Sequence, residues 1–162
     1  MYVAGMTGPK WLVLTWRLPA ASSTARVATW RNLQRLGAIS LTPGAVIVPF
    51  SEDLLEQLEW IAEDIVQRDG DAYVLPVTEL PDGDDEEIRR RMERDRSAEY
   101  EQLKASAATL SRRVPSEGVR YERELAALER GLARATARDY FASTARGRAE
   151  RAIRLARKRK ER

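Results

Sequence analysis

The run Trp11-Leu12-Val13-Leu14-Thr15-Trp16-Arg17-Leu18 is apolar and partly β-branched, and Pro19 ends it. This composition predicts a β-strand. Ser22-Ser23-Thr24 then offer N-cap residues for a helix over residues 25–36, and Gly37 offers its C-terminal stop. The chain is therefore predicted to begin with a strand followed by a helix.

Outward from this start, residues 39–41 and 45–48 are predicted strands. They are joined by Thr42-Pro43-Gly44, in which Pro at the second and Gly at the third position favour a type II turn. Ser51 is the predicted N-cap of a second helix that stops at Gly70.

Each predicted helix has an apolar stripe. In the first helix we expect Val27, Trp30 and Leu33 to be buried. In the second helix the expected buried residues are Leu54, Leu55, Leu58, Ile61, Ala62 and Ile65.

A last strand is predicted over residues 72–77, with Pro76 favouring an edge or irregular position. The order is then βαββαβ, which predicts an α+β, ferredoxin-like core. Two helices would cover one sheet face, and either the helical tail or a second subunit would cover the other.

Charge and hydropathy divide the chain near residue 80. Residues 1–80 contain 6 Lys or Arg and 9 Asp or Glu, whereas residues 81–162 contain 22 and 16. We therefore expect a core over 1–80 and an α-helical extension over 81–162. Within this extension a helix over 84–113 should form a hairpin with a second helix, followed by a basic C-terminal helix. The second helix has a near-heptad stripe: Tyr121, Leu125, Leu128, Leu132 and Ala135.

The composition excludes several kinds of catalysis. With no His and no Cys, the chain has neither the usual neutral-pH base nor a thiolate nucleophile. Carboxylate-metal chemistry remains, and the acidic run over residues 82–87 is its best candidate. Because that run coincides with the first turn of a predicted helix, stabilisation of the helix dipole is the favoured interpretation. We expect no enzyme activity, no catalytic or metal-ligating residue and no cofactor. No apolar run is long enough to cross a membrane, so the expected location is the cytoplasm.

Two groups of cations predict contact with a polyanion. In the first predicted helix, Arg31 and Arg35 are one turn apart, and Arg26 is expected near the same face. These guanidinium groups could bind phosphates or read base edges, or simply form a solvated face. The C-terminal helix is more basic, with nine cations between Arg146 and Arg162. Its binding candidates are Arg151, Arg154, Arg157 and Lys158, and the alternatives for this segment are a solubilising tail or a membrane-surface contact.

The sequence also resembles a known family. The resemblance rests on Trp11-Leu12-Val13-Leu14, Leu18-Pro19, the run from Ala25-Arg26-Val27 through Trp30-Arg31-Asn32-Leu33-Gln34-Arg35-Leu36-Gly37-Ala38, and Val46-Ile47-Val48-Pro49. These residues are similar to the N-terminal domain of ChrB, and the similarity continues to Arg138-Asp139-Tyr140-Phe141. ChrB proteins are bacterial chromate-resistance regulators that continue into a further domain, which these 162 residues do not include.

The resemblance implies a ferredoxin-like core and a DNA-binding role in transcriptional control. It implies that the basic core residues Arg17, Arg26, Arg31 and Arg35 take part. For a chromate oxyanion, Arg17 with Arg26 and Arg31 is the grouping we expect.

More distant similarities are to the central domain of PaaX-type repressors and to small CRISPR adaptation nucleases. Those nucleases place an Asp at the end of the first strand, where this chain has Thr15-Trp16-Arg17.

The sequence therefore predicts a non-enzymatic, homodimeric DNA-binding regulator. The alternatives are a metal-dependent nuclease using Asp82, Asp84 and Asp85, and a scaffold protein that pairs through its helical extension.

Overall fold

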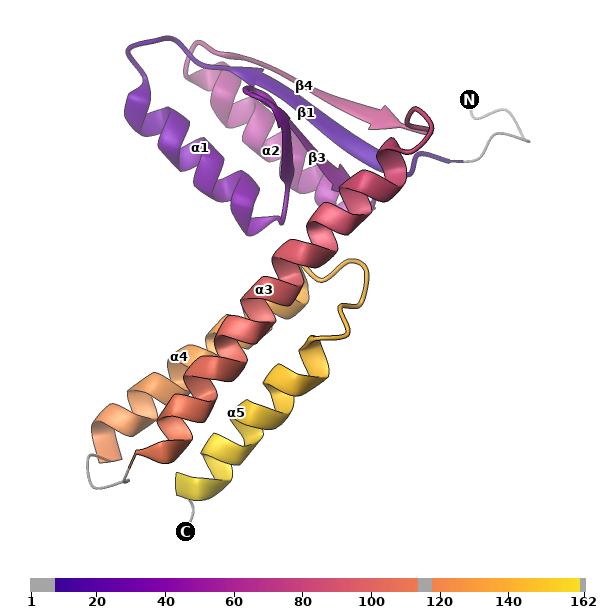
Figure 1. Ribbon diagram of the computed structural model, residues 1–162. Helices are drawn as coiled ribbons and strands as arrows, with labels where there is room; N and C mark the ends of the chain where they lie inside the picture. Colours follow the sequence, from indigo (N-terminus) through magenta and orange to yellow (C-terminus); the bar gives the residue numbers. More distant parts are fainter. Residues whose placement is uncertain (1–7, 114–117, 161–162) are drawn as a thin grey trace. The chain divides into compact units, whose positions relative to one another are not determined.

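The computed structural model describes residues 8–113 and 118–160 of the chain (Figure 1). They belong to two compact units, Met1–Ile88 and Arg89–Arg162, and the chain passes from one to the other within a long helix. None of the helices in the described part is long and apolar enough to cross a membrane.

The first unit is built around a four-stranded sheet. Its elements are β1 (Trp11–Arg17), α1 (Ser23–Arg35), β2 (Ile39–Thr42), β3 (Ala45–Pro49), α2 (Glu52–Gln67) and β4 (Asp71–Val77). The strand order is β2-β3-β1-β4 and every neighbouring pair is antiparallel. This βαββαβ arrangement confirms the predicted ferredoxin-like core.

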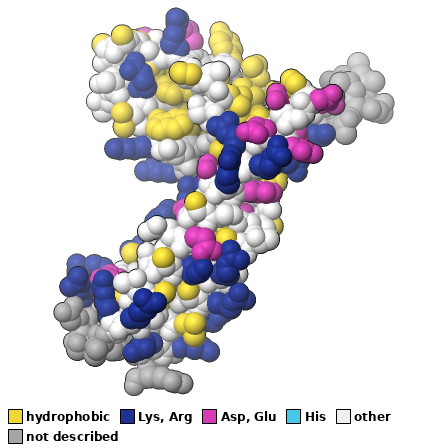
Figure 2. Space-filling model, in the orientation of Figure 1, with side chains coloured by type: hydrophobic (Ala, Val, Ile, Leu, Met, Phe, Trp, Pro, Cys, Tyr) yellow, Lys and Arg dark blue, Asp and Glu magenta, His cyan; other side chains and the backbone are white. Residues whose placement is uncertain are grey.

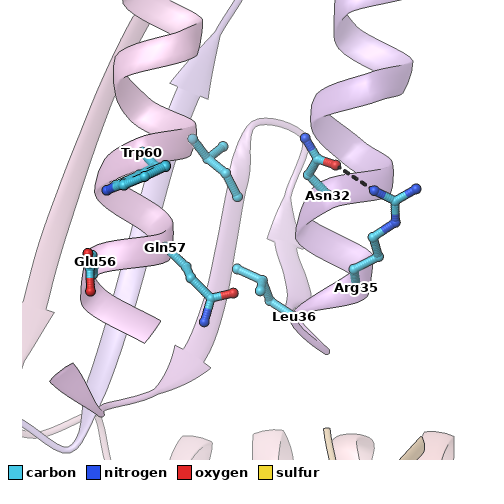
Figure 3. Close-up of a pocket in the computed structure, with 7 residues that line it drawn as sticks. Asn32, Arg35, Leu36, Glu56, Gln57 and Trp60 are labelled. Carbon is cyan, nitrogen blue, oxygen red and sulfur yellow. Dashed lines mark hydrogen bonds between the residues drawn. The ribbon is translucent and has the colours of Figure 1, made fainter. Parts of the chain in front are cut away.

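The two faces of the sheet differ in exposure. Leu12 and Leu14 of β1 are fully buried, and α1 and α2 lie on one side of the strands (Figures 1 and 3). Because side chains alternate along a strand, Val13 and Thr15 point to the opposite face. Their partners on the edge strand β4 are Leu75 and Tyr73. Leu75 is 47% exposed and Tyr73 is 66% exposed.

Local sequence explains two of the element boundaries. Gly44 has φ of +84°, the positive value that the third position of a type II turn requires. The Ser51 side chain accepts a hydrogen bond from Leu54 N at 3.1 Å, which confirms the predicted cap of α2.

The predicted stripe of α1 is partly wrong. Leu33 is fully buried, but Val27 is 48% exposed and Trp30 is only half-buried. The residue that packs inward one turn before Leu33 is Thr29, which is 3% exposed. The sequence pattern missed Thr29 because the predicted stripe was built from apolar side chains alone. Ser22, the N-cap residue, makes no side-chain cap hydrogen bond.

The second unit is a set of three helices, α3 (Asp84–Arg112), α4 (Gly118–Ala137) and α5 (Arg146–Lys160); α3 begins in the first unit. The predicted stripe of α4 packs inward, with Tyr121, Leu125 and Ala135 buried. The core of this unit includes two clusters of buried residues. One is formed by Ala107, Leu110, Tyr121, Leu125, Ile153 and Ala156, and the other by Tyr100, Ala135, Ala145 and Ala149. Residues 114–117, which join the two helices of the predicted hairpin, lie outside the described residues.

Candidate nucleic-acid interface

One face of α5 packs into the helical unit. Ala145, just before the helix, and Ala149, Ile153 and Ala156 within it are at most 4% exposed. The Tyr121 hydroxyl of α4 donates a buried hydrogen bond of 2.7 Å to the Ala156 carbonyl. Small residues at three of these positions let α5 lie close to α4, so the helix is fixed along its length.

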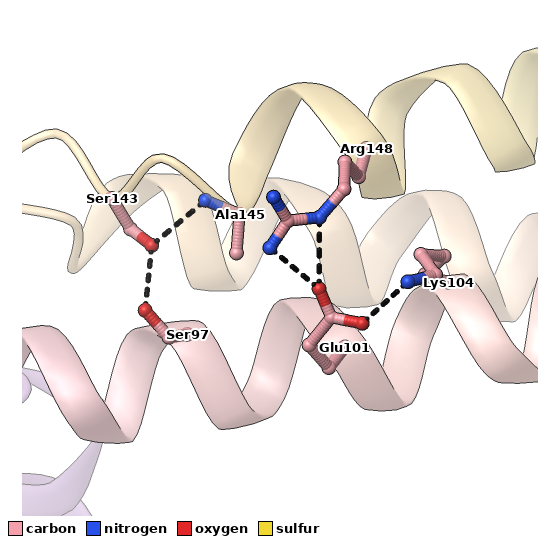
Figure 4. A network of polar contacts seen from close by, with 6 residues as sticks. All are labelled: Ser97, Glu101, Lys104, Ser143, Ala145 and Arg148. Carbon is pink, nitrogen blue, oxygen red and sulfur yellow. Dashed lines mark hydrogen bonds and ion pairs between the residues drawn. The ribbon is translucent and has the colours of Figure 1, made fainter.

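Arg148 ties one flank of α5 to α3 (Figure 4). Its Nε and Nη2 donate to Glu101 Oε1 at 3.0 and 2.8 Å, and Lys104 Nζ lies 2.6 Å from Glu101 Oε2. Hydrogen bonds from Lys104 and Arg148 lower the pKa of the Glu101 carboxyl from its ordinary value. Ser97 and Ser143, whose hydroxyls are 3.0 Å apart, add a second link at the start of α5. This flank of α5 is structural.

Two other cations of α5 also have acidic partners. Arg157 donates from Nε to Glu129 Oε1 of α4 at 2.9 Å. Arg146 donates to Glu150 one turn later at 2.7 Å, and that hydrogen bond raises the pKa of Arg146. Of the four predicted binding residues on α5, the structure therefore places Arg157 in an ion pair within the unit.

The remaining three predicted residues form a row on the outer face of α5. On an ideal helix, Arg151, Arg154 and Lys158 lie about 140° to 180° around the axis from the buried Ala149. All three are exposed, and none forms an ion pair with a described residue. Figure 2 shows Lys and Arg side chains gathered on the surface of the helical unit. We name these three residues the α5 row.

A second row on α4 was missed by the sequence analysis. Arg123, Arg130 and Arg134 are exposed and lie on the side of α4 opposite the Tyr121 stripe. In the described part of the chain these three guanidinium groups also form no ion pair. Their spacing of seven and four residues places them on one helix face, and this pattern could have identified them. We name them the α4 row.

Other arginines of this unit are internal. Glu99 accepts hydrogen bonds from both Arg96 and Arg138, whose side chains are 13% and 18% exposed. Burial and the neighbouring Arg96 lower the pKa of Arg138, although a guanidinium stays protonated at neutral pH. Burial also raises the pKa of Tyr100, whose hydroxyl donates to Asp139 at 3.0 Å. These groups join α3 to the end of α4.

The predicted cations of the first unit have unequal surroundings. Arg17 donates to Asp71 of β4 at 2.6 Å, with both side chains exposed. Arg26 donates to the Pro19 carbonyl at 3.1 Å, and five residues place it about 140° around α1 from Arg31. The expectation that Arg26 shares the face of Arg31 and Arg35 is therefore wrong.

Arg31 and Arg35 remain available on α1. Both are exposed, and within the described ranges neither forms an ion pair. Arg35 donates to the side-chain oxygen of Asn32 at 3.2 Å.

The acidic run begins α3, as the helix-dipole interpretation predicts. Asp84, Asp85, Glu86 and Glu87 lie in the first turn, and Asp85 accepts a 2.7 Å hydrogen bond from the Trp11 indole. Over residues 8–113 and 118–160, no group of three or more carboxylates is arranged to hold a metal ion.

Comparison with known proteins gives the family. A family model described as "Protein ChrB, N-terminal" matches residues 26–162. A curated relative, Protein ChrB of Cupriavidus metallidurans, is 34% identical over 144 residues, which cover 86% of this chain and 43% of that protein. The chain thus spans less than half the length of this relative. No solved structure matches. The chain belongs to the ChrB N-terminal domain family.

Proposed function

We propose that this chain is the DNA-binding part of a ChrB-type regulator of chromate resistance, acting in the cytoplasm without catalysis. Membership of the ChrB N-terminal family supports the regulatory context. The observation that carries the DNA-binding part is the α5 row, Arg151, Arg154 and Lys158, three exposed cations that have no acidic partner among the described residues.

In the proposed mechanism, Lys and Arg side chains bind DNA phosphates, and the release of counterions from the DNA drives this binding. DNA carries a condensed atmosphere of cations, and each phosphate neutralised by Lys or Arg releases some of them. Arg148 and Arg157 orient α5 through Glu101 and Glu129. The helix is thereby held rigid, and the α5 row is presented outward at little further cost in conformational entropy.

The α4 row extends the same kind of surface. α4 and α5 are packed neighbours, and each row lies on the side of its helix turned away from the packed side chains, so each row can contact phosphates on its own outer face. Such a surface binds duplex DNA with little sequence preference. Arg31 and Arg35 of α1, with the nearby amide of Asn32, are the proposed source of contacts to base edges.

Chromate and dimerisation are further parts of the proposal. An oxyanion at Arg17 would compete with the Asp71 carboxylate, which accepts from Nε and Nη2 of that guanidinium. Arg26 and Arg31, about 140° apart around α1, would not bind the same oxyanion together. The proposed homodimer buries the outer sheet face that displays Tyr73 and Leu75.

The test is a titration of fluorescently labelled duplex DNA at several salt concentrations, between about 50 and 300 mM. The variant Arg151→Gln/Arg154→Gln removes two cations of the α5 row. We expect the slope of log affinity against log salt to fall by about 2 and the Kd to rise at least about tenfold.

The control variant is Lys10→Gln/Arg68→Gln, which removes the same net charge from the first unit, where Arg68 is paired with Asp64. It should bind DNA nearly as wild type does. Equal losses in both variants, or no binding by wild type at the lowest salt, would refute the proposal. Cleavage of the DNA when Mg²⁺ is added would favour the nuclease alternative.

A further inference from the structure

A groove between α1 and α2 lies apart from the basic rows, entirely within the first unit. It has a volume of about 480 Å³ and is open to solvent. That volume lies within the range of small-molecule sites. Its lining residues are Asn32, Arg35, Leu36, Glu56, Gln57, Trp60 and Ile61.

The groove presents an apolar surface suited to a flat ring. Trp60 of α2 is 70% exposed, and Leu36 and Ile61 are half-buried beside it. A tryptophan this exposed leaves most of its apolar area in water, although indole faces bind other rings well in offset stacking. Leu36 and Ile61 line the same groove as Trp60, so a ring bound in the groove can contact aliphatic side chains as well as the indole.

The α1 side of the groove suits an anion. The Arg35 guanidinium is oriented by its 3.2 Å hydrogen bond to Asn32 Oδ1. Glu56 lines the same groove, but in the described part of the chain Arg35 forms no ion pair with it or any other acid. Because the Asn32 oxygen is the acceptor, its amide N–H₂ group is left to donate. A carboxylate between Arg35 and Asn32 would receive charge-assisted hydrogen bonds.

The α2 side offers an acceptor. Gln57 Nε2 donates to the Asp53 carbonyl at 3.2 Å, which fixes the side-chain amide. Figure 3 shows Gln57 extending from α2 toward α1 with its oxygen on the groove side. A hydroxyl or amine on a bound ring would find this oxygen as its partner.

We propose that the α1–α2 groove binds a small aromatic carboxylate whose ring also bears a hydrogen-bond donor. The ring stacks on Trp60, the carboxylate binds Arg35 and Asn32, and the donor binds Gln57. The groove shares Arg35 and Asn32 with the proposed base contacts of α1, but its ligand binding does not require DNA and is tested without it.

The probe is 6-hydroxy-2-naphthoate, titrated into the full chain by calorimetry and by NMR of the four tryptophan indole N–H groups. The indole N–H signal of Trp60 is assigned as the one that is missing from the spectrum of Trp60→Phe. We expect 6-hydroxy-2-naphthoate to bind and to shift this signal. 2-Naphthol, which lacks the carboxylate, should bind about ten- to a hundredfold more weakly, as expected for loss of a charge-assisted contact. 2-Naphthoate, which lacks the hydroxyl, should bind several-fold more weakly.

Two variants locate the site. Arg35→Gln should weaken binding of 6-hydroxy-2-naphthoate about ten- to a hundredfold, and Trp60→Ala should abolish it. Arg31→Gln is the matched control, because Arg31 lies on the same helix and is exposed but does not line the groove. No binding by a wild-type chain with a folded circular dichroism spectrum would overturn the proposal. So would equal losses in Arg31→Gln and Arg35→Gln, or an unchanged affinity in Trp60→Ala.

Discussion

The end of α2 shows how single residues control the first unit. Asp69 has φ of +60°, and Gly70 N donates to the Ile65 carbonyl at 3.0 Å. The left-handed residue is therefore Asp69, although the sequence pattern pointed to Gly70 as the stop. Gly70 is required for another reason. A Cβ atom there would lie 2.5 Å from the Arg17 carbonyl oxygen and 2.7 Å from Ile65 Cγ2.

We predict that Gly70→Ala destabilises the first unit by about 1–3 kcal/mol, the usual cost of overpacking, because the nearest atom belongs to the backbone of β1. The measurement is the urea midpoint of unfolding. Gly147→Ala is the control: no atom lies within 4 Å of its added Cβ, so this variant should gain up to about 1 kcal/mol of helix propensity. A urea midpoint of Gly70→Ala equal to that of wild type would contradict this prediction, because the β1 backbone would then accommodate the added Cβ without cost.

At the same scale, the sequence identified cations but not their partners. Arg17 and Arg157 were predicted as binding residues, and the structure pairs them with Asp71 and Glu129, which are 54 and 28 residues away in the sequence. Periodicity describes one helix at a time. It has no means of finding a partner that only folding brings near.

Among the elements, α5 combines a structural and an exposed surface on one helix. Its Arg148 flank is bound to Glu101, while the α5 row faces outward. The attachment depends on pH. The pKa of Glu101 is lowered in the folded state. Its contribution to stability is therefore present above the unfolded-state pKa and is lost as the pH falls through the folded-state value.

We predict that Glu101→Gln lowers the thermal midpoint of unfolding at about pH 7, and that its difference from wild type shrinks in acid, once the pH falls through the folded-state pKa of the Glu101 carboxyl. Glu93→Gln on the same helix is the control. Glu93 is exposed and forms no ion pair with a described residue, so its variant should follow wild type at both pH values. A Glu101→Gln deficit that stays constant with pH would contradict the role given to this carboxylate.

For the whole molecule, the outer sheet face has the clearest consequence. Tyr73 and Leu75 are exposed side by side on the edge strand, and apolar surface of this kind is typical of contacts between chains. We predict that sedimentation velocity gives about twice the 18.4 kDa mass of one chain. Tyr73→Ser/Leu75→Ser should give the monomer mass.

Val119→Ser is the control for that experiment, because Val119 is 76% exposed on α4 and should leave the dimer intact. A wild-type chain that sediments as a monomer at every concentration would remove the dimer from the proposal. Monomers from both variants would place the contact elsewhere.

The order βαββαβ and the helical extension follow from the sequence, because strand and helix periods, Ser51 and the Gly44 turn are properties of neighbouring residues. The outward direction of the α5 row was only partly predictable. Helical spacing separates its cations from the buried Ala149 and Ala156, but it does not show that Glu101 and Glu129 pair with other arginines of α5. The burial of Thr29 instead of Val27, the α1–α2 groove and the ion pairs of Arg17 and Arg157 came from tertiary structure alone. Each depends on distances between segments remote in the chain, and those distances are set by how the elements pack.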